Sequence, residues 1–345
     1  MARDILVTGA AGFIGFHLVR HLRASTDATI VGIDNLDDYY DPALKRDRLQ
    51  ILRDLEGFEF IEQDLTDHDA VRQVFKTHTF DEVVHLAARP GVRASTEYPE
   101  PTVKCNIDGF LSVLEGCRHH GIDHLVYASS SSVYGPYCGR PLSEHQPVDH
   151  PASLYAATKV SNEAMAHSYA DLYDIPTTGL RFFTVYGPWG RPDMAYYLFA
   201  DAIASGEPIE VFNHGEMERD FTYVGDVVDG IGRVLASPPE ADVEWSAESP
   251  DPASSRAPYR LYNIGRGEPV PLMKFIDTIE RAMGREADKR FREMPPGDVE
   301  STHADVTDLT EAFDYRPTTD LTEGIGRFIE WYHRYHGVAL ESAAE

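Results

Sequence analysis

The stretch Asp4-Ile-Leu-Val-Thr-Gly-Ala-Ala-Gly-Phe-Ile-Gly15 decides the fold of this chain. Asp4–Thr8 is a short apolar run typical of a buried strand, and an amphipathic stretch to about Ser25 follows the glycines. Glycines between a strand and a helix allow a tight turn. They also let backbone N–H groups approach a pyrophosphate at the positive end of the helix. The order of strand, glycine turn and helix therefore predicts the first unit of a dinucleotide-binding fold.

An acidic residue at the end of the second predicted strand, Thr29–Asp34, indicates which dinucleotide binds. An acid there accepts hydrogen bonds from a ribose 2′-hydroxyl and would repel a 2′-phosphate, so Asp34 favours NAD over NADP. The alternative is a glycine turn that only helps a helix pack on its sheet. Asp64, which ends the third strand, is a candidate adenine contact, and the alternative role is a helix N-cap together with Thr66 and Asp67.

Strand and helix patterns alternate through the first 185 residues. This alternation implies right-handed crossovers and a parallel sheet, so we predict an α/β chain with a doubly wound parallel sheet of the Rossmann type. Further strands are expected at Phe58–Ile61, Glu82–Leu86, His124–Ser129 and Thr177–Phe183, with helices between them such as Asp67–Lys76 and Pro101–His119.

After Gly187 the pattern loosens, and we expect a smaller, partly discontinuous α/β substrate-binding lobe. The predicted division assigns residues 1–186 and about 221–264 to the NAD-binding domain, and about 187–220 and 265–345 to the lobe. Residues 237–258 are rich in Pro, Ser, Ala and acid, and we expect a solvated, mobile insertion there.

The composition is strongly acidic, with 31 Lys and Arg against 57 Asp and Glu, a net charge of −26. Nucleic acid and anionic membranes both need clustered cations, so we expect neither as a partner. No apolar run reaches the roughly 18 residues of a membrane span, and no signal-peptide pattern is present. Cys105, Cys117 and Cys138 form no disulfide framework, which favours a cytoplasmic location. His333 and His336 lack a further convergent ligand, so we expect no metal site.

Tyr155 and Lys159 stand at positions i and i+4 of a predicted helix and face the same side. A phenol with a pKa of about 10 is a poor base at neutral pH, but a lysine ammonium and a nicotinamide cation nearby would favour the phenolate. The spacing alone also fits an ordinary exposed pair. The fifth strand, 25 residues before Tyr155, ends in Ser129-Ser-Ser-Ser-Val-Tyr-Gly135, and such hydroxyls face the ligand crevice of an open α/β sheet. A serine run can also be a plain turn.

Taken together, these motifs resemble the extended short-chain dehydrogenase/reductase family, and within it the nucleotide-sugar 4-epimerases that act on UDP-glucuronate. The resemblance covers the chain nearly end to end, except the insertion at 237–258. The run from Phe182-Phe-Thr184 to Trp189-Gly-Arg191 is what points to a uronic acid. The specific segments are His85-Leu-Ala-Ala-Arg-Pro-Gly-Val-Arg93, Ser129 to Gly135, Tyr155 to Lys159 and Arg181-Phe-Phe-Thr-Val-Tyr-Gly-Pro-Trp-Gly-Arg-Pro-Asp-Met194.

The resemblance implies a role for each matching residue. Ser130 takes the place of the catalytic Ser or Thr, Tyr155 is the base, and Lys159 holds the phenolate and the nicotinamide ribose. The implied NAD contacts are Gly9, Gly12, Phe13, Ile14, Gly15, Asp34, Asn35, Asp64, Leu65, Leu86, Ala87, Ala88, Asn106, Tyr155 and Lys159, and Asn106 stands where a family Asn supports the site. The implied UDP-sugar contacts are Arg93, Ser131, Ser132, Thr184, Arg191, Phe212, Arg219 and Asp298.

Two departures from the family pattern matter for the substrate. Galactose-type epimerases usually carry Asn at the position of Thr184, so the pocket for sugar C6 should differ. They often carry Arg-x-Gly-Asp near the diphosphate, where this chain has Pro295-Pro-Gly-Asp298, so the diphosphate should rely more on Arg219. Arg93 has an alternative reading as a loop cap near the diphosphate or a second subunit, and Arg191 as a surface residue beside Asp193.

The residues after Ser130 indicate the reaction. Family dehydratases and decarboxylases place acids there, whereas Ser131 and Ser132 cannot act as acid or base at C5 and C6. The implied reaction is therefore reversible C4 epimerisation of UDP-glucuronate to UDP-galacturonate through a 4-keto intermediate. Oxidative decarboxylation, epimerisation of a neutral UDP-hexose and an inactive NAD-sensing protein remain alternatives. Family members commonly form dimers through two long helices, here Pro101–His119 and Ser153–Tyr173.

Overall fold

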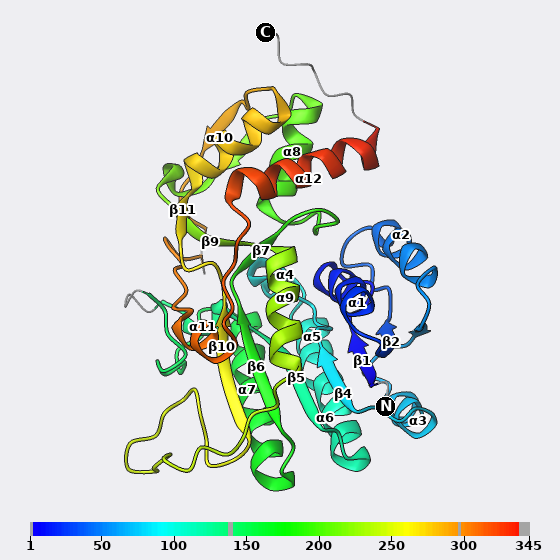
Figure 1. The fold of residues 1–345 in the computed structure, drawn as a ribbon. Coiled ribbons are helices and arrows are strands. Elements are labelled where there is room, and N and C mark those ends of the chain that lie inside the picture. Colours follow the sequence, from blue (N-terminus) through cyan, green and yellow to red (C-terminus); the bar gives the residue numbers. More distant parts are fainter. Residues whose placement is uncertain (1–2, 137–140, 296–297, 338–345) are drawn as a thin grey trace.

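A single seven-stranded parallel sheet forms the centre of the protein, with the strand order β10-β6-β5-β4-β1-β2-β3 (Figure 1). The computed structural model describes residues 3–136, 141–295 and 298–337, so Cys138 and the pair 296–297 of the predicted Pro-Pro-Gly-Asp run lie outside the described residues. The predicted doubly wound parallel sheet is confirmed. Its strands are β1 (Asp4–Thr8), β2 (Thr29–Asp34), β3 (Phe58–Glu62), β4 (Glu82–His85), β5 (His124–Ser130), β6 (Thr177–Phe182) and β10 (Tyr259–Ile264).

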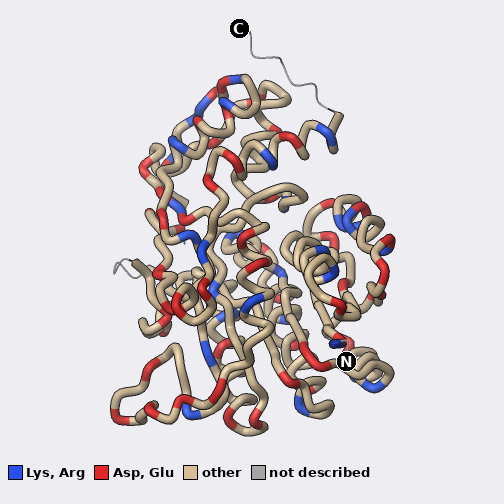
Figure 2. The backbone as a smooth tube through the Cα atoms, in the orientation of Figure 1, with Lys and Arg blue, Asp and Glu red and all other residues tan. Residues whose placement is uncertain are grey.

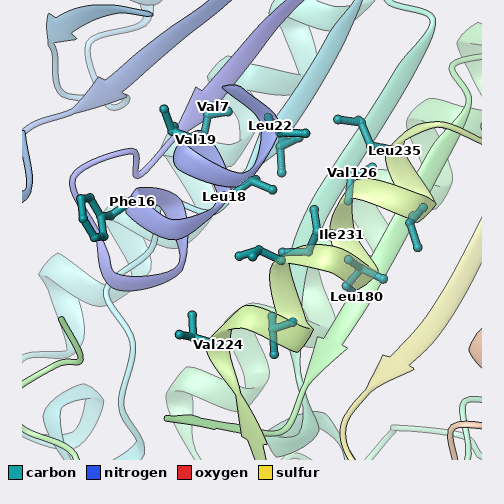
Figure 3. Packing of buried hydrophobic residues seen from close by; sticks show 14 of the residues in the cluster. Val7, Phe16, Leu18, Val19, Leu22, Val126, Leu180, Val224, Ile231 and Leu235 are labelled. Carbon is teal, nitrogen blue, oxygen red and sulfur yellow. The ribbon is translucent and has the colours of Figure 1, made fainter. Parts of the chain in front are cut away.

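Helices α1 (Phe13–Ser25) and α9 (Val224–Leu235) cover one face of this sheet (Figure 3). The apolar residues of α9 recur at helical spacing, and Val224, Val227 and Ile231 are fully buried against α1 and the strands. Burying each such side chain stabilises the fold by about 1.5–3 kcal/mol relative to leaving it exposed. Helix α2 (Pro42–Arg53) follows β2 on the outer side, and Asp41 caps its N-terminus by accepting from the Ala43 amide at 2.9 Å.

The opposite face is covered by α3 (His68–Thr77), α6 (Gly109–His120) and α7 (Leu154–Tyr173). The helical stretch predicted over 101–119 is present, but it is not α-helical throughout. Instead, α5 (Pro99–Val103) passes through a π-helical segment, Lys104–Asp108, before α6 begins. The wider turn brings the Asn106 side chain into contact with α7, because its amide nitrogen donates to the Thr158 hydroxyl at 3.0 Å. Such π-helical turns often mark functional sites.

The C-terminal elements form a second cluster at one end of the molecule (Figure 1). Its core is aromatic, and the rings of Phe221 and Phe275 stack in parallel with centroids 3.8 Å apart. The division of the chain into two domains remains a prediction. The remaining elements are α4 (Val92–Glu97), β7 (Thr184–Tyr186), α8 (Ala195–Ser205), β8 (Ile209–Val211), β9 (Glu218–Tyr223), β11 (Pro269–Pro271), α10 (Leu272–Met283), β12 (Lys289–Phe291), α11 (Thr307–Phe313) and α12 (Leu321–His336), with short 3₁₀ turns at Ser131–Tyr134 and Phe212–Gly215.

The insertion at 237–258 contains turns and residues of two isolated bridges, Ser246 with Ser249 and Ser254 with Arg260, rather than helix or strand. Its C-terminal part is anchored to α7, since Ser255 is hydrogen-bonded to His167 at 2.8 Å and Arg256 forms an ion pair with Asp171 at 3.0 Å. Its earlier part is also held, because Asp251 forms an ion pair with His145 at 2.9 Å. The mobility of the insertion stays a prediction.

Acidic residues occur in every part of the traced chain, with Lys and Arg scattered among them (Figure 2). Several of the cations are paired with acids, for example Arg233 with Asp229 at 2.8 Å on α9. Among the residues described, no helix combines the length and the apolar character that crossing a bilayer requires.

Candidate active site

A cavity of about 1460 Å³ opens at the carboxyl ends of the central strands. It lies where the neighbouring strands β1 and β4 meet, the point in the sheet from which the strand order runs outward in opposite directions. Ligands of open α/β sheets bind at such a switch point. The cavity walls contain every predicted site residue except Asn106. The predicted residues on its walls are Gly9, Gly12, Phe13, Ile14, Gly15, Asp34, Asn35, Asp64, Leu65, Leu86, Ala87, Ala88, Arg93, Ser130, Ser131, Ser132, Tyr155, Lys159, Thr184, Arg191, Phe212, Arg219 and Asp298.

The glycine turn between β1 and α1 leaves no space for side chains. Gly9 has φ +72° and its amide donates to the Ile33 carbonyl at 2.7 Å, which fixes the turn against β2. A Cβ on Gly15 would lie 2.1 Å from the Gly9 carbonyl oxygen, so only glycine fits there. Gly12 is the N-cap of α1 and supplies no side-chain hydrogen bond, so the first amides of the helix face the cavity uncapped. These features fit a dinucleotide pyrophosphate.

At the far end of β2, Asp34 is buried and accepts from the Leu36 amide at 2.9 Å. The Lys45 ammonium lies 3.6 Å from the same carboxylate, and both side chains line the cavity. The side chain of Asn35 donates to Asp64 at 3.1 Å. Asp64 also accepts from the Thr66 amide at 2.8 Å, in the turn before α3. The N-cap of α3 itself is Asp67, which accepts from the Ala70 amide at 3.1 Å.

The carboxyl end of β5 meets the N-terminus of α7 at the proposed reaction centre. Lys159 is only 2% exposed, and its Nζ donates to the Ala128 carbonyl at 2.8 Å. Burial lowers the pKa of this ammonium to about 8. Ser130 accepts from the Ser132 amide at 3.2 Å, so the serine run is both a turn and part of the cavity wall.

The expected low pKa of the Tyr155 phenol does not arise from the protein's own groups. Burial raises its pKa, and only a hydrogen bond with Ser130 and the charge of Arg191 oppose this effect. Lys159 is not among the groups that shift it. Desolvation outweighs these two effects, and a cationic group that enters the cavity would lower the pKa of the phenol.

Asn106 lies one layer behind the cavity, where it is 1% exposed. Its side-chain oxygen accepts from the Arg89 amide at 2.8 Å, and its side-chain nitrogen donates to Thr158 at 3.0 Å and to the Arg89 carbonyl at 3.2 Å. A direct contact of Asn106 with the cofactor therefore stays a prediction. The residue joins the loop after β4 to the helix that carries Tyr155 and Lys159.

Four of the predicted substrate residues meet at the opposite end of the cavity. Arg219, on β9, donates to Asp298 at 2.7 Å, and Arg93 lies 3.8 Å from the same carboxylate. The Arg93 guanidinium also stacks over the Phe212 ring, 4.6 Å from its centroid. Both arginines thus line one wall, and Arg93 is 58% exposed there, as both its proposed roles would allow.

Between these two ends, Thr184 begins β7 and Arg191 follows in the next loop, and both line the cavity. Arg191 forms a bidentate pair with Asp193, with Nε 2.9 Å from Oδ1, so the predicted neighbour is indeed its partner. Asp193 also accepts from the Tyr39 hydroxyl at 3.1 Å, which links this loop to the segment after β2.

Sequence reasoning missed several residues that shape this cavity. Arg89 forms an ion pair with Asp37 at 2.7 Å, and both line the cavity. Glu163 accepts two hydrogen bonds from the fully buried Arg181, at 2.9 and 2.8 Å, and one from Ser129 at 2.5 Å. Glu163 stands one helical turn after Lys159, so the i, i+4 spacing in the sequence could have indicated that both residues lie on the same side of α7. No group of three or more potential metal ligands converges in the part of the chain that the structure describes.

The fold and this site define a dinucleotide-dependent enzyme of the short-chain dehydrogenase/reductase type. The model of the NAD dependent epimerase/dehydratase family matches residues 5–265, and the chain belongs to that family.

Three similar proteins illustrate the relationship. Protein CapI of Staphylococcus aureus is 49% identical over 96% of this chain and 99% of its own length. A probable UDP-glucuronate 4-epimerase of Rhizobium meliloti is 44% identical over 95% of this chain and 96% of its own. The crystal structure of UDP-glucuronic acid 4-epimerase from Bacillus cereus, in complex with UDP-glucuronic acid and NAD, aligns with a TM-score of 0.85 at 33% identity, covering 96% and 99% of the two chains.

Proposed function

We propose that this protein interconverts UDP-glucuronate and UDP-galacturonate by epimerisation at C4, with NAD retained and recycled in the site. The observation that carries this proposal is the cavity itself. It joins an uncapped glycine turn, the Tyr155–Lys159 pair and a wall of arginines in one continuous space. The relatives and the solved structure whose names specify UDP-glucuronate support the same substrate.

Bound NAD supplies a hydride acceptor and donor for sugar C4. The glycine turn at Gly9, Gly12 and Gly15 would hold its pyrophosphate, and Asp34 would hold a ribose hydroxyl. Tyr155 takes the proton from the C4 hydroxyl and later returns it to the ketone oxygen. Ser130 hydrogen-bonds with the phenol and orients it, and Lys159, one helical turn further along α7, is held by the Ala128 carbonyl, where it would bind the nicotinamide ribose.

The fate of the ketone follows from the residues near C5 and C6. Ser131 and Ser132 line the cavity immediately after Ser130 and provide hydroxyls rather than carboxylates. A 4-keto uronate is a β-keto acid and loses CO₂ readily when its carboxylate is desolvated. Donors from these serines, Thr184 and Arg191 would keep the carboxylate polar and poorly aligned for cleavage. Rotation of the ketone and return of the hydride to its other face then give the epimer.

The wall formed by Arg219, Arg93 and Phe212 suits the UDP end of the substrate. Two guanidinium groups next to each other bind a diphosphate by charge-assisted hydrogen bonds. The Phe212 ring provides an apolar surface for the base. Asp298 fixes the orientation of Arg219 and leaves carboxylate lone pairs that can accept ribose hydroxyls.

We further propose a cytoplasmic homodimer that pairs through α5, α6 and α7. Val103 and Leu172 are apolar side chains on these helices and are 40% and 66% exposed, which supports a partner on this face. Light scattering of the purified protein and of the Leu172→Glu variant tests the dimer: we expect a dimeric wild type and a monomeric variant. Cell fractionation tests the compartment.

An NMR time course with UDP-glucuronate, and with no cofactor or reductant added, tests the proposed reaction. We expect galacturonate signals to grow to a constant ratio, without release of CO₂. A UDP-pentose as the main product would identify a decarboxylase instead. Turnover of UDP-glucose but not of UDP-glucuronate would identify a neutral-hexose epimerase, and NAD binding without turnover a sensing protein.

A further inference from the structure

Arg48 on α2 is a fully buried arginine whose hydrogen bonds all go to uncharged oxygens. Its Nη1 donates to the Ala11 carbonyl at 2.9 Å and to the Tyr40 hydroxyl at 2.7 Å. Its Nη2 donates to the Trp189 carbonyl at 2.7 Å and to the Gly190 carbonyl at 3.1 Å. Removing a cation from water without a carboxylate partner is costly, so this arrangement calls for a specific role.

The two groups of acceptors belong to different parts of the site. Ala11 lies inside the glycine turn, between Gly9 and Gly12. Trp189 and Gly190 lie in the loop after β7 and directly precede Arg191. One guanidinium therefore joins the pyrophosphate cradle to the loop that carries the arginine proposed to face the sugar carboxylate.

The loop that Arg48 holds has an unfavourable backbone conformation. Trp189 has φ +58°, a left-handed conformation that is unfavourable for a residue other than glycine. The neighbouring Pro188 carbonyl is hydrogen-bonded to Nε2 of His17 on α1 at 2.8 Å, so three consecutive carbonyls are held from the cofactor side. Ring contacts of the indole with Phe16 and Trp331, at centroid distances of 5.5 and 5.3 Å, complete the support.

We propose that Arg48 is a positioning residue that sets substrate choice by fixing the 187–190 loop, and thereby aiming Arg191 at the carboxylate of the sugar. Arg48 does not line the cavity, so it acts through Arg191 rather than by contact. This inference rests on the proposed function. It adds that the same side chain that braces the NAD cradle also sets the preference for a uronate over a neutral hexose.

Binding measurements separate this role from a merely structural one. Dissociation constants of UDP-glucuronate and UDP-glucose are measured by calorimetry on NAD-loaded wild type, Arg48→Met, Arg191→Met and the double variant. The quantity compared is the ratio of the two constants, because a general loss of structure weakens both ligands alike. Arg46→Met is the matched control, since Arg46 lies on the same helix, is exposed and is absent from the cavity wall.

We expect wild type and Arg46→Met to prefer UDP-glucuronate, and Arg48→Met and Arg191→Met each to lose about tenfold or more of that preference. The double variant should lose no more than Arg191→Met alone, because both changes remove one interaction. Additive losses would show that Arg48 acts only as a distant charge, and equal weakening of both ligands would show a structural role; either result overturns the inference.

Two further measurements keep the inference testable. Should Arg48→Met fail to fold, Tyr40→Phe removes a single acceptor of Arg48 and keeps the ring; it must reduce the preference for the uronate, and an unchanged ratio contradicts the inference. A wild type with no preference for UDP-glucuronate and no epimerisation would instead contradict the proposed function. The two failures are therefore distinguishable.

Discussion

Arg219 and Asp298 form an ion pair at 2.7 Å, and this pair places a β9 arginine on the wall of the cavity where the chain lacks the arginine of the usual Arg-x-Gly-Asp run. The partner Asp298 belongs to that same run, whose residues 296–297 lie outside the described chain. The aspartate of the usual run is thus present as Asp298, while the arginine beside it is supplied by β9. A cation aimed by a carboxylate keeps one geometry, which suits a diphosphate that must not move while the sugar rotates.

Replacing Arg219 by Met should raise the KM for UDP-glucuronate by about tenfold and change kcat little. The diphosphate is bound equally in the ground state and in the transition state, so its loss affects binding only. Steady-state kinetics measures both constants. Arg290→Met is the control, because Arg290 is exposed on β12 and does not line the cavity. A large fall in kcat at unchanged KM would contradict the assignment.

Replacing Thr184 by Val should increase the share of UDP-pentose among the products. The change removes a hydroxyl donor from the cavity wall at the start of β7 and keeps the side-chain volume, so the sugar carboxylate is less well held. The ratio of released CO₂ to epimer measures the effect. Thr96→Val, on α4 and outside the cavity, should leave the ratio unchanged. An unchanged ratio in Thr184→Val as well would remove the protective role.

Replacing Lys159 by Met should stabilise the cofactor-free protein at pH 7 while abolishing turnover. Burial lowers the pKa of Lys159 from 10.5 to about 8, so below pH 8 the folded state carries a penalised charge. That penalty corresponds to at most about 3 kcal/mol. It fades as the pH rises through 8 and is gone above 10.5, so the advantage of the variant should shrink over that interval.

Thermal unfolding of wild type and Lys159→Met at several pH values measures this difference. Lys76→Met is the control, because Lys76 is exposed on α3 and should show no pH-dependent difference. A variant that is less stable than wild type at pH 7 would show that the hydrogen bond to Ala128 outweighs the desolvation of the ammonium.

Replacing Asp34 by Ser should weaken NAD binding by about tenfold or more and reduce the discrimination against NADP. The carboxylate is buried on the cavity wall and is the group expected to accept a ribose hydroxyl. Fluorescence titration of cofactor-stripped protein with both dinucleotides measures the change. Glu62→Gln, an exposed acid on the adjacent strand, is the control. Equal affinity of wild type for NAD and NADP would contradict the role of Asp34.

The local patterns that were strong in the sequence correspond to real elements. The six strands expected before Gly187 all exist, with ends that differ by at most a residue, because each is a short apolar run between clear turn signals. The glycine turn and the Tyr155–Lys159 spacing also fall where the chemistry needs them. These features depend on residues close together in the sequence, so they can be read from the sequence alone.

Features that depend on contacts between distant segments could not be predicted. The π-helical turn at Lys104–Asp108 exists because Asn106 bonds with Arg89 and Thr158, which lie far from it in the sequence. The raised pKa of Tyr155 results from burial, which the spacing of Tyr and Lys does not reveal. The role of Arg48 likewise depends on carbonyls that only the folded chain brings together.

The central claim is that hydrogen leaves C4 of the sugar and returns to the same carbon from the opposite face. UDP-glucuronate with deuterium at C4, incubated with the purified enzyme in ordinary water, tests it most directly. We predict UDP-galacturonate that retains the deuterium at C4, and no conversion by Tyr155→Phe. Loss of the deuterium to solvent during conversion would contradict the account.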